Sequence, residues 1–199
     1  MPGSTTLDVA VLVFSRAPRP GRVKTRLVPR LGEWGAARLH ARMTAHALRT
    51  AHAARCGPVE LYDSARQRGA DLGERMYRAL AEALRRHRAA ILIGADCPAL
   101  RPAHMRSAAR ALAGGCDVAL APAEDGGYVL IGARRISPAL FAGIDWGSPS
   151  VYAASVRRLE ALGYRWRALP RLWDVDRPED LERLRWLRFA SAARPRARR

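Results

Sequence analysis

Residues 9–27 read VAVLVFSRAPRPGRVKTRL, and this stretch decides the fold class. Its first six residues, Val9 to Phe14, form a short, continuous apolar run rich in valine, which is typical of a strand buried on both faces of a parallel sheet. The remainder is polar and contains Pro18, Pro20 and Gly21, which interrupt regular structure and indicate a loop. We therefore expect a central strand that delivers the following loop to one edge of a sheet.

The segments beyond this loop alternate between helical and strand patterns. Apolar residues at helical spacing predict helices over 33–55, 72–87, 102–113 and 151–162, and a last one from Pro178 to about Phe189. Short apolar runs predict strands over 59–62, 89–93, 117–121, 128–131 and 166–169. This alternation predicts an α/β fold with three layers and a mostly parallel central sheet. We expect a single domain over 1–189 and a basic, disordered tail over 190–199.

Charge is the most unusual property of the composition, because the formal net charge is +17. A charge of this size attracts polyanions or small anionic molecules. Of the 35 basic residues 34 are arginine, which is typical of a GC-rich coding bias, and we attribute much of the charge to that bias. The three cysteines have no metal-ligand or disulfide spacing, and no apolar run reaches the roughly 18 residues of a membrane span. We expect a cytoplasmic protein without a membrane span.

Lys24 is the single lysine of the chain, and a position that keeps lysine among so many arginines is a candidate for needing a compact ammonium. It lies in the loop 16–27 with Pro20, Gly21 and Arg26, after the predicted central strand, where open α/β sheets bind their ligands. The loop has neither a Walker A nor a GxGxxG pattern. We interpret it as a phosphate cradle in which two cations offset diphosphate charge; the alternative is a solvated basic turn.

Asp96 follows the strand predicted over 89–93. A carboxylate in this position suits Mg²⁺ or Mn²⁺, because hard divalent cations prefer carboxylate, phosphate and water oxygens. The alternative is a cap for the helix that begins at Pro102. We favour the metal ligand, because five residues, one of them Pro98, separate Asp96 from that helix, which itself begins with a proline.

A second acidic cluster, which includes Asp174 and Asp176, precedes the terminal helix. Asp176 and Glu179 have the spacing of a capping box, so helix capping and metal binding are both open for Asp176. A second carboxylate at this edge would complete a metal site that Asp96 alone leaves weak.

Two further loops carry glycines that permit close approach of the backbone to a ligand. In the first, Asp71 equally suits the cap of the next helix. In the second, an Asp-Gly pair equally suits a plain hairpin, and Asp125 is a candidate to orient or deprotonate an acceptor. The candidate ligand-binding residues in these loops are Gln67, Asp71, Gly73, Gly126 and Gly127. Cys97 is disfavoured as a nucleophile, since no histidine lies near it in the sequence.

Together these motifs resemble the GT-A-fold glycosyltransferase-like family often labelled for arsenosugar biosynthesis. That family is similar to the nucleotidyltransferases for molybdopterin cofactor and phospholactate, and to nucleotide-diphospho-sugar transferases. The motifs follow one another in the family's order, and the combination is more specific than any one of them. The matching residues are Pro20, Gly21, VKTRL at 23–27, Gln67, Gly69, DLGERM at 71–76, Gly94, Asp96, Pro98, Pro122, DGGYVLIG at 125–132, Trp146, Gly147 and DVDRPEDL at 174–181.

The resemblance implies a Rossmann-like GT-A sheet that binds a nucleoside diphosphate. It places Asp96 in the position of the fold's metal-binding aspartate and implies that Asp176 is the second magnesium ligand. Arg177 stands where the family usually has threonine, which leaves Asp174 as the alternative second ligand. The segment 62–67 is also shorter than in the family.

We therefore expect a Mg²⁺-dependent transferase that binds a nucleotide sugar and an unknown small acceptor, with Lys24, Arg26 and Asp125 in catalytic positions. One alternative is a nucleotidyltransferase that releases pyrophosphate from a nucleoside triphosphate. Another is a non-catalytic polyanion-binding protein on the same fold. Nucleic acid is not the expected partner, because the basic residues are not interleaved with clustered aromatic side chains.

Overall fold

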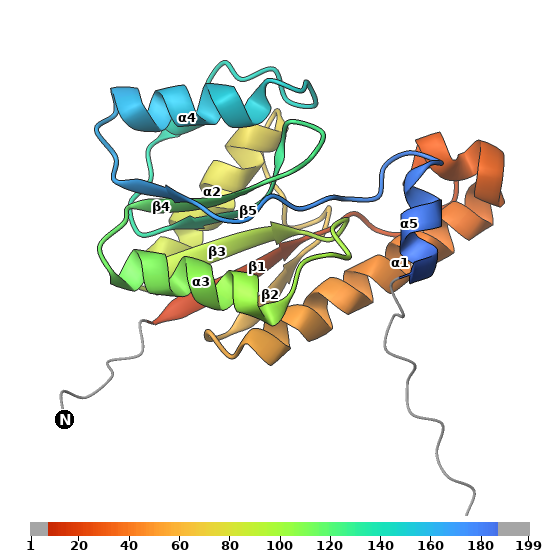
Figure 1. The fold of residues 1–199 in the computed structure, drawn as a ribbon, viewed down its shortest axis with the longest axis horizontal. Helices are drawn as coiled ribbons and strands as arrows, with labels where there is room; N and C mark the ends of the chain where they lie inside the picture. The colour runs from red at the N-terminus through yellow and green to blue at the C-terminus, as the bar shows by residue number, and fades with distance from the viewer. Residues whose placement is uncertain (1–7, 187–199) are drawn as a thin grey trace, which may run out of the picture.

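The computed structural model describes residues 8–186, whose strands form one six-stranded sheet (Figure 1). The strands are β1 (Val9–Phe14), β2 (Val59–Tyr62), β3 (Ala89–Gly94), β4 (Val118–Pro122), β5 (Tyr128–Ala133) and β6 (Trp166–Ala168). Their order in the sheet is β2-β1-β3-β5-β4-β6, and every neighbouring pair is parallel except the two that involve β5. The predicted α/β class with a mostly parallel sheet is confirmed.

Within residues 8–186 five α-helices alternate with the strands: α1 (Val28–Ala54), α2 (Leu72–Leu84), α3 (Pro102–Ala113), α4 (Val151–Ala161) and α5 (Asp180–Trp186), together with the short 3₁₀ helices η1 (Thr25–Leu27) and η2 (Pro138–Leu140). Helix α1 begins five residues before its predicted start, because Pro29 suits a first helical turn. Gly32, with a φ of 67°, then breaks the helical backbone of α1. Helix α5 begins two residues after the predicted Pro178. Its predicted end and the predicted tail over 190–199 lie outside the described residues.

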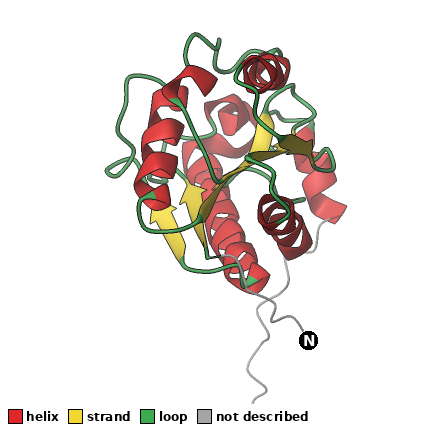
Figure 2. Ribbon diagram, turned by 90° about the vertical axis from the view of Figure 1, so that its left-hand side faces the viewer, coloured by secondary structure: helices red, strands yellow, loops and turns green. Residues whose placement is uncertain are grey.

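Helices cover both faces of the sheet and give the predicted three layers (Figure 2). One face packs against α1 and α3, largely through alanine side chains of these helices. The other face packs against α2, η2 and α4, where Leu80, Leu140 and Leu159 are buried. The sheet is therefore a middle layer with a core on each side.

Strand β1 shows why its sequence is a continuous apolar run. Val9, Val11 and Val13 belong to the core under α1 and α3, whereas Leu12 and Phe14 belong to the core under α2. Successive side chains of a strand point to opposite faces, so a strand between two helical layers needs apolar residues at every position. The predicted central, doubly buried strand is confirmed.

The loops that carry the predicted site residues lie at one edge of the sheet. Strands β1, β2, β3, β4 and β6 run the same way, so their carboxyl ends lie at the same edge of the sheet. The segments that leave this edge are 15–27, 63–71, 95–101, 123–127 and 169–179. Every residue predicted for the site lies in one of them, except Gly73, which is in the first turn of α2.

Helix α5 packs beside the N-terminal half of α1, at the right of Figure 1. Leu27, Met43 and Val175 form the buried centre of this contact, and Leu181 and Leu184 of α5 pack against it. This contact returns the end of the described chain to the loop that follows β1.

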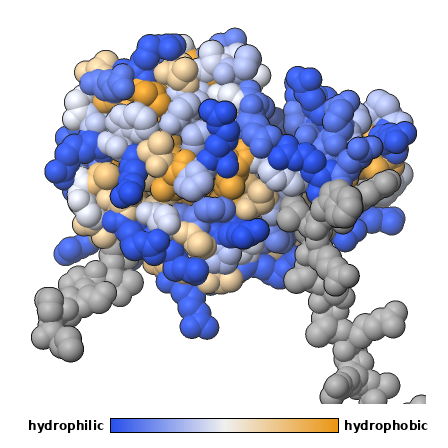
Figure 3. All heavy atoms as spheres, viewed as in Figure 1, coloured by the Kyte–Doolittle hydropathy of each residue, from blue (hydrophilic) through white to orange (hydrophobic). Residues whose placement is uncertain are grey.

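On the face seen in Figure 1, polar residues surround smaller apolar patches (Figure 3). Within residues 8–186 no helix combines the length and apolar character needed to cross a membrane.

Candidate functional site

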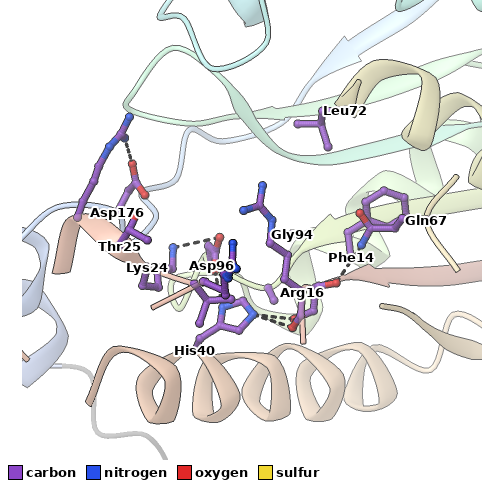
Figure 4. A pocket seen from close by; sticks show the side chains of 15 residues that line it. Phe14, Arg16, Lys24, Thr25, His40, Gln67, Leu72, Gly94, Asp96 and Asp176 are labelled. Atoms are coloured by element: carbon purple, nitrogen blue, oxygen red, sulfur yellow. Dashed lines mark hydrogen bonds and ion pairs between the residues drawn. The ribbon is translucent and has the colours of Figure 1, made fainter. Parts of the chain in front are cut away.

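A cavity of about 520 Å³ opens at the carboxyl ends of β1 and β3 (Figure 4). Its wall comes chiefly from the loop after β1, the start of the loop after β3, and single residues of α1 and of the segment after β6. Cationic side chains outnumber acidic ones in this wall. The charged and imidazole side chains that line the cavity are Arg16, Arg22, Lys24, Arg26, His40, Asp96 and Asp176. Such a cavity favours an anionic ligand.

Lys24 is held at the floor of this site by two contacts. Its Nζ lies 3.0 Å from Asp96 Oδ2 and donates a hydrogen bond of 2.5 Å to the carbonyl oxygen of Val175. The side chain is only 5% exposed. The backbone of Lys24 adopts the left-handed conformation, with φ 48° and ψ 42°, which is uncommon for a residue other than glycine. The single lysine of the chain thus occupies a constrained and nearly buried position.

Asp96 presents its two carboxylate oxygens to different surroundings. Oδ1 is covered by protein and lies 3.6 Å from His40 Nδ1, whereas 43% of the side chain as a whole is exposed toward the cavity. Burial alone would raise the pKa of Asp96, but the contact with His40 and the positive charge of Lys24 outweigh it and lower that pKa. Asp96 is therefore an anion at neutral pH.

His40 is a site residue that the sequence interpretation missed. It belongs to the buried stripe of α1 and is 4% exposed. Its Nε2 lies 3.0 Å from the carbonyl oxygen of Arg16 and 3.1 Å from Ser15 Oγ, and Ser15 Oγ lies 2.7 Å from Thr44 Oγ1. These contacts fix the ring with Nδ1 toward Asp96 (Figure 4). A histidine at helical spacing with buried apolar residues was the signal available in the sequence.

Asp174 lies close enough to two other carboxylates for their charges to act on it. Burial, followed by the negative charge of Asp125, raises the pKa of Asp174 to about 6, and Asp96 adds to the rise. Lys24 opposes it. Three predicted site carboxylates therefore share one electrostatic environment, although Asp125 and Asp174 do not line the cavity.

The raised pKa of Asp174 predicts a pH-dependent cost to stability. The folded state binds the Asp174 proton more tightly than the unfolded chain does, so the ionised carboxylate destabilises the fold fully above about pH 6, and this cost is lost as the pH falls below about 4. We expect Asp174→Asn to be more stable than the wild type at pH 7.5, by up to about 3 kcal/mol, and nearly equally stable near pH 3.5. Urea unfolding of both proteins at the two pH values measures this, and an equal difference at both would contradict it.

Asp176 lines the cavity and forms an ion pair with Arg26, and both side chains are largely exposed (Figure 4). The capping box with Glu179, one of the two alternatives left open for Asp176, is not what the structure shows. Asp180 Oδ2 instead accepts hydrogen bonds from the backbone N–H groups of Asp176 and Arg177, at 2.9 and 2.8 Å. Because α5 begins at Asp180, the residue that reaches back lies one position beyond Glu179. This leaves the Asp176 carboxylate free of a capping role.

Gln67 lines the cavity, but its amide group also has a structural task. Nε2 donates hydrogen bonds to the carbonyl oxygens of Ser15, at 2.9 Å, and of Tyr62, at 2.7 Å. These carbonyls lie just past β1 and at the end of β2. Gln67 therefore ties the ends of two neighbouring strands together, and its ligand-binding role stays a prediction.

Apart from Gln67, the predicted residues of the glycine-bearing loops contribute packing and capping rather than cavity wall. Asp71 caps α2 by accepting a hydrogen bond of 2.7 Å from the Glu74 N–H, which is the alternative left open above. Gly126 and Gly127 form the turn between β4 and β5, where Asp125 Oδ1 accepts from the Gly127 N–H. The predicted ligand-binding residues that do not line the cavity are Pro20, Gly21, Asp71, Gly73, Gly126 and Gly127.

Gly73 has a clear packing role, because a Cβ atom there would lie 2.5 Å from the indole ring of Trp146. We expect Gly73→Ala to lower the free energy of unfolding by about 2 kcal/mol through overpacking. Thermal or urea unfolding measures the loss. The double variant Gly73→Ala/Trp146→Phe should regain part of it, since the smaller ring vacates the contact; no recovery would contradict the packing explanation.

Cys97 is not an available nucleophile. It is buried, and burial raises the pKa of its thiol to about 12. Both properties agree with the interpretation of Cys97 drawn from the sequence.

A phosphate ligand would complete the site that the residues present offer to a divalent cation. Within residues 8–186 no group of three or more His, Cys, Asp or Glu side chains is placed to hold a metal ion. Mg²⁺, however, is commonly bound by one or two carboxylates together with phosphate oxygens and water. Asp96 with Asp174 or Asp176 suits such a shared site, because the mutual repulsion that acts on Asp174 is what a divalent cation would relieve. Metal binding by these residues stays a prediction.

Comparison with known proteins assigns the chain to a family. The family model described as "Uncharacterized protein conserved in bacteria (DUF2064)" matches residues 34–148. The chain belongs to this family. The DUF2064 match includes His40, Gln67, Asp96 and Asp125, whereas the loop of Lys24 precedes it and the second acidic cluster follows it.

Solved structures place this DUF2064 protein among nucleotide-sugar transferase folds. A protein of Desulfovibrio desulfuricans G20, described as a candidate nucleotide-diphospho-sugar transferase, is 31% identical, with a TM-score of 0.80 over 92% of this chain and 89% of that one. The resemblance drawn from the motifs is thereby confirmed. The comparison with curated proteins gave no match.

Two more distant structures show the fold alone. CMP:2-keto-3-deoxy-manno-octonic acid synthetase, solved with CTP, is 12% identical, with a TM-score of 0.52 over 89% of this chain and 97% of that one. Rv0371c of Mycobacterium tuberculosis H37Rv is 19% identical, with a TM-score of 0.50 over 90% of this chain and 98% of that one.

Proposed function

We propose that this DUF2064 protein is a transferase that binds the diphosphate of a nucleotide sugar in the cavity and transfers the glycosyl group to a small acceptor. The observation that carries the proposal is the excess of cationic side chains where β1 and β3 end. Arg16 and Arg22 line the cavity, and within residues 8–186 neither has a carboxylate partner. The likeness to the Desulfovibrio protein supports the choice of ligand.

Glycosyl transfer from a nucleotide sugar requires positive charge near the leaving group. In glycosyl transfer the bond between the anomeric carbon and the phosphate oxygen breaks, and the nucleoside diphosphate leaves with increased negative charge. Preorganised cations such as Arg22, Lys24 and Arg26 lower the barrier by stabilising that charge. Mg²⁺ held by Asp96 with Asp174 or Asp176 would add charge stabilisation of the same kind. Asp125, at the same edge of the sheet, is our candidate to orient the acceptor.

Nucleotidyl transfer is the alternative reaction for the same cavity. There the acceptor attacks the α-phosphate of a nucleoside triphosphate, and pyrophosphate leaves. The same cations stabilise either leaving group, so the geometry of the phosphate grip serves both reactions. The identity of the released product separates them.

A thermal-shift screen of nucleoside di- and triphosphates, with and without Mg²⁺, tests the binding proposal. A ligand present at about 100 times its dissociation constant stabilises a protein by about 2.7 kcal/mol, so at least one nucleotide is expected to raise the melting temperature by several degrees. Release of nucleoside diphosphate from the matching nucleotide sugar then indicates glycosyl transfer, and release of pyrophosphate from the triphosphate indicates nucleotidyl transfer. A flat response across the panel would contradict nucleotide binding.

The polyanion-binding alternative predicts a different pattern. A flat nucleotide response combined with salt-sensitive binding to nucleic acid, retained in Lys24→Ala and Asp96→Asn, would favour it.

A cytoplasmic location is part of the proposal and is checked by cell fractionation.

A further inference from the structure

The ammonium of Lys24 occupies the position from which a cation would reach Asp96. Oδ1 of Asp96 is covered by protein and faces His40, so the exposed part of the carboxylate is the side of Oδ2. Oδ2 is the atom that Lys24 contacts, at 3.0 Å. A cation that enters from the cavity therefore meets the oxygen that Lys24 already holds.

We propose that Lys24 is an internal counter-ion of Asp96, which a divalent cation displaces and which then turns to the diphosphate of the nucleotide. This inference rests on the proposed function for its second half, since the diphosphate is the new partner of Lys24. The displacement of Lys24 by a divalent cation depends only on the contacts that Lys24 and Asp96 make.

The surroundings of Lys24 support such an exchange. The ammonium of Lys24 contacts Asp96 directly and also acts electrostatically on Asp174. The negative charge of Asp125 acts on Asp174 as well. The charge of this one ammonium is thus set against Asp96 and Asp174, and a divalent cation, with twice the charge, balances these two carboxylates better. Lysine suits an exchange of partners, because its ammonium is a compact charge on a flexible four-carbon stem, whereas arginine favours a fixed bidentate geometry.

A second pair in the same cavity follows the same pattern. Arg26, a predicted phosphate ligand, pairs with Asp176, a predicted metal ligand. Without ligand, the cations of the site therefore neutralise its acids. When a divalent cation and a diphosphate bind together, the two carboxylates contact the cation and the two basic side chains contact the phosphate groups. The Arg26 pair is exposed and contributes little to stability, so the exchange depends on the buried Lys24.

The exchange couples the binding of the two ligands. A cation that binds alone must break the contact of Lys24 with Asp96 and leave a nearly buried ammonium without that partner. A diphosphate offers the ammonium a new partner, so each ligand strengthens the binding of the other by the same factor. We expect this factor to be about tenfold in the wild type, within the range typical of coupled sites, and to be lost when Lys24 is replaced by an uncharged residue.

The single lysine allows a direct measurement on the unaltered protein. In tag-free protein carrying lysine labelled at Cε and Nζ, one side-chain NMR signal is expected, and it belongs to Lys24. Titration with Mg²⁺ alone should move this signal saturably toward the position of a free lysine. Asp96→Asn should show the shifted signal without Mg²⁺ and no further response. A Lys24 signal that stays unmoved while Mg²⁺ saturates the protein would overturn the proposal.

Binding of Mn²⁺ alone, followed by electron paramagnetic resonance, supplies the matched comparison. Lys24→Met removes the competing charge and should tighten Mn²⁺ binding about tenfold. Arg19→Met removes the same charge from an exposed side chain of the same loop that does not line the cavity, and should change the affinity about threefold or less. Equal or weaker Mn²⁺ binding by Lys24→Met than by the wild type would overturn the proposal.

The two experiments separate this inference from the proposed function. If no nucleotide binds but Mg²⁺ releases Lys24 and Lys24→Met binds Mn²⁺ more tightly, the exchange stands and the nucleotide proposal fails. If nucleotides bind and Lys24 does not respond to the cation, the exchange fails and the proposed function stands. Should Lys24→Met prove unstable, the NMR titration of the wild type decides the matter.

Discussion

Asp96→Asn is expected to lower the turnover of the proposed transferase reaction about 100- to 1,000-fold, because the change removes the carboxylate charge that pairs with Lys24. Asp96 lies at the cavity floor, in contact with Lys24 and facing His40. An amide keeps the shape and one acceptor oxygen, but it does not neutralise Lys24 and is a poor ligand for a divalent cation. We therefore expect loss of activity with retention of the fold.

Product release from the substrate identified in the nucleotide screen measures this effect. The matched control is Asp145→Asn, the same chemical change on an exposed side chain outside the cavity, which should keep nearly full turnover. Circular dichroism and thermal unfolding show whether Asp96→Asn is folded. A folded Asp96→Asn protein with a third or more of the wild-type turnover would rule out the assigned role.

Gly126→Ala is expected to cost about 3 kcal/mol or more of stability. Gly126 has a φ of 91°, a conformation that side chains rarely adopt, and a Cβ atom there would lie 2.0 Å from the carbonyl oxygen of Pro149. The obstacle is backbone, so the strain cannot be relieved by a change of rotamer, and the segment that leads into α4 must move.

The adjacent glycine provides the control. At Gly127 the nearest atom to a new Cβ is Asp125 Oδ1, at 3.2 Å, and the Asp125 side chain is exposed and able to shift. Gly127→Ala should therefore cost about 1 kcal/mol, as expected for a small local adjustment. Urea unfolding of both variants gives the comparison, and equal costs would show that the approach to Pro149 does not decide the effect.

The placement of the site was predictable where it depends on the ends of strands. The apolar run of β1 and the short run before Asp96 identified two neighbouring parallel strands, and parallel strands deliver their following loops to one edge. The lone lysine drew attention, for a compositional reason, to a loop that supplies much of the cavity wall. These inferences need only local pattern and one topological rule.

Contacts between distant segments could not be predicted from local sequence patterns. The position of His40 beneath Asp96 depends on how α1 crosses the sheet, and the fit of Gly73 against Trp146 joins residues 73 positions apart. The pairing of Lys24 with Asp96 was likewise not predicted. A sequence motif indicates which side chains bind a ligand, but it does not indicate which of them pair with one another when the ligand is absent. The cap of α5 was misassigned by one residue, since Glu179 and Asp180 are both acidic and only the backbone geometry distinguishes them.

Val175 joins three remote parts of the polypeptide through its own peptide groups. Its N–H donates to the carbonyl oxygen of Asp96, at 2.9 Å, and its carbonyl oxygen accepts from Lys24, 151 residues away. The amide proton of Val175 is thus a natural sensor of whether the site is assembled. Its hydrogen–deuterium exchange rate should rise in any variant that detaches the last segment, even where the sheet and its two cores remain intact.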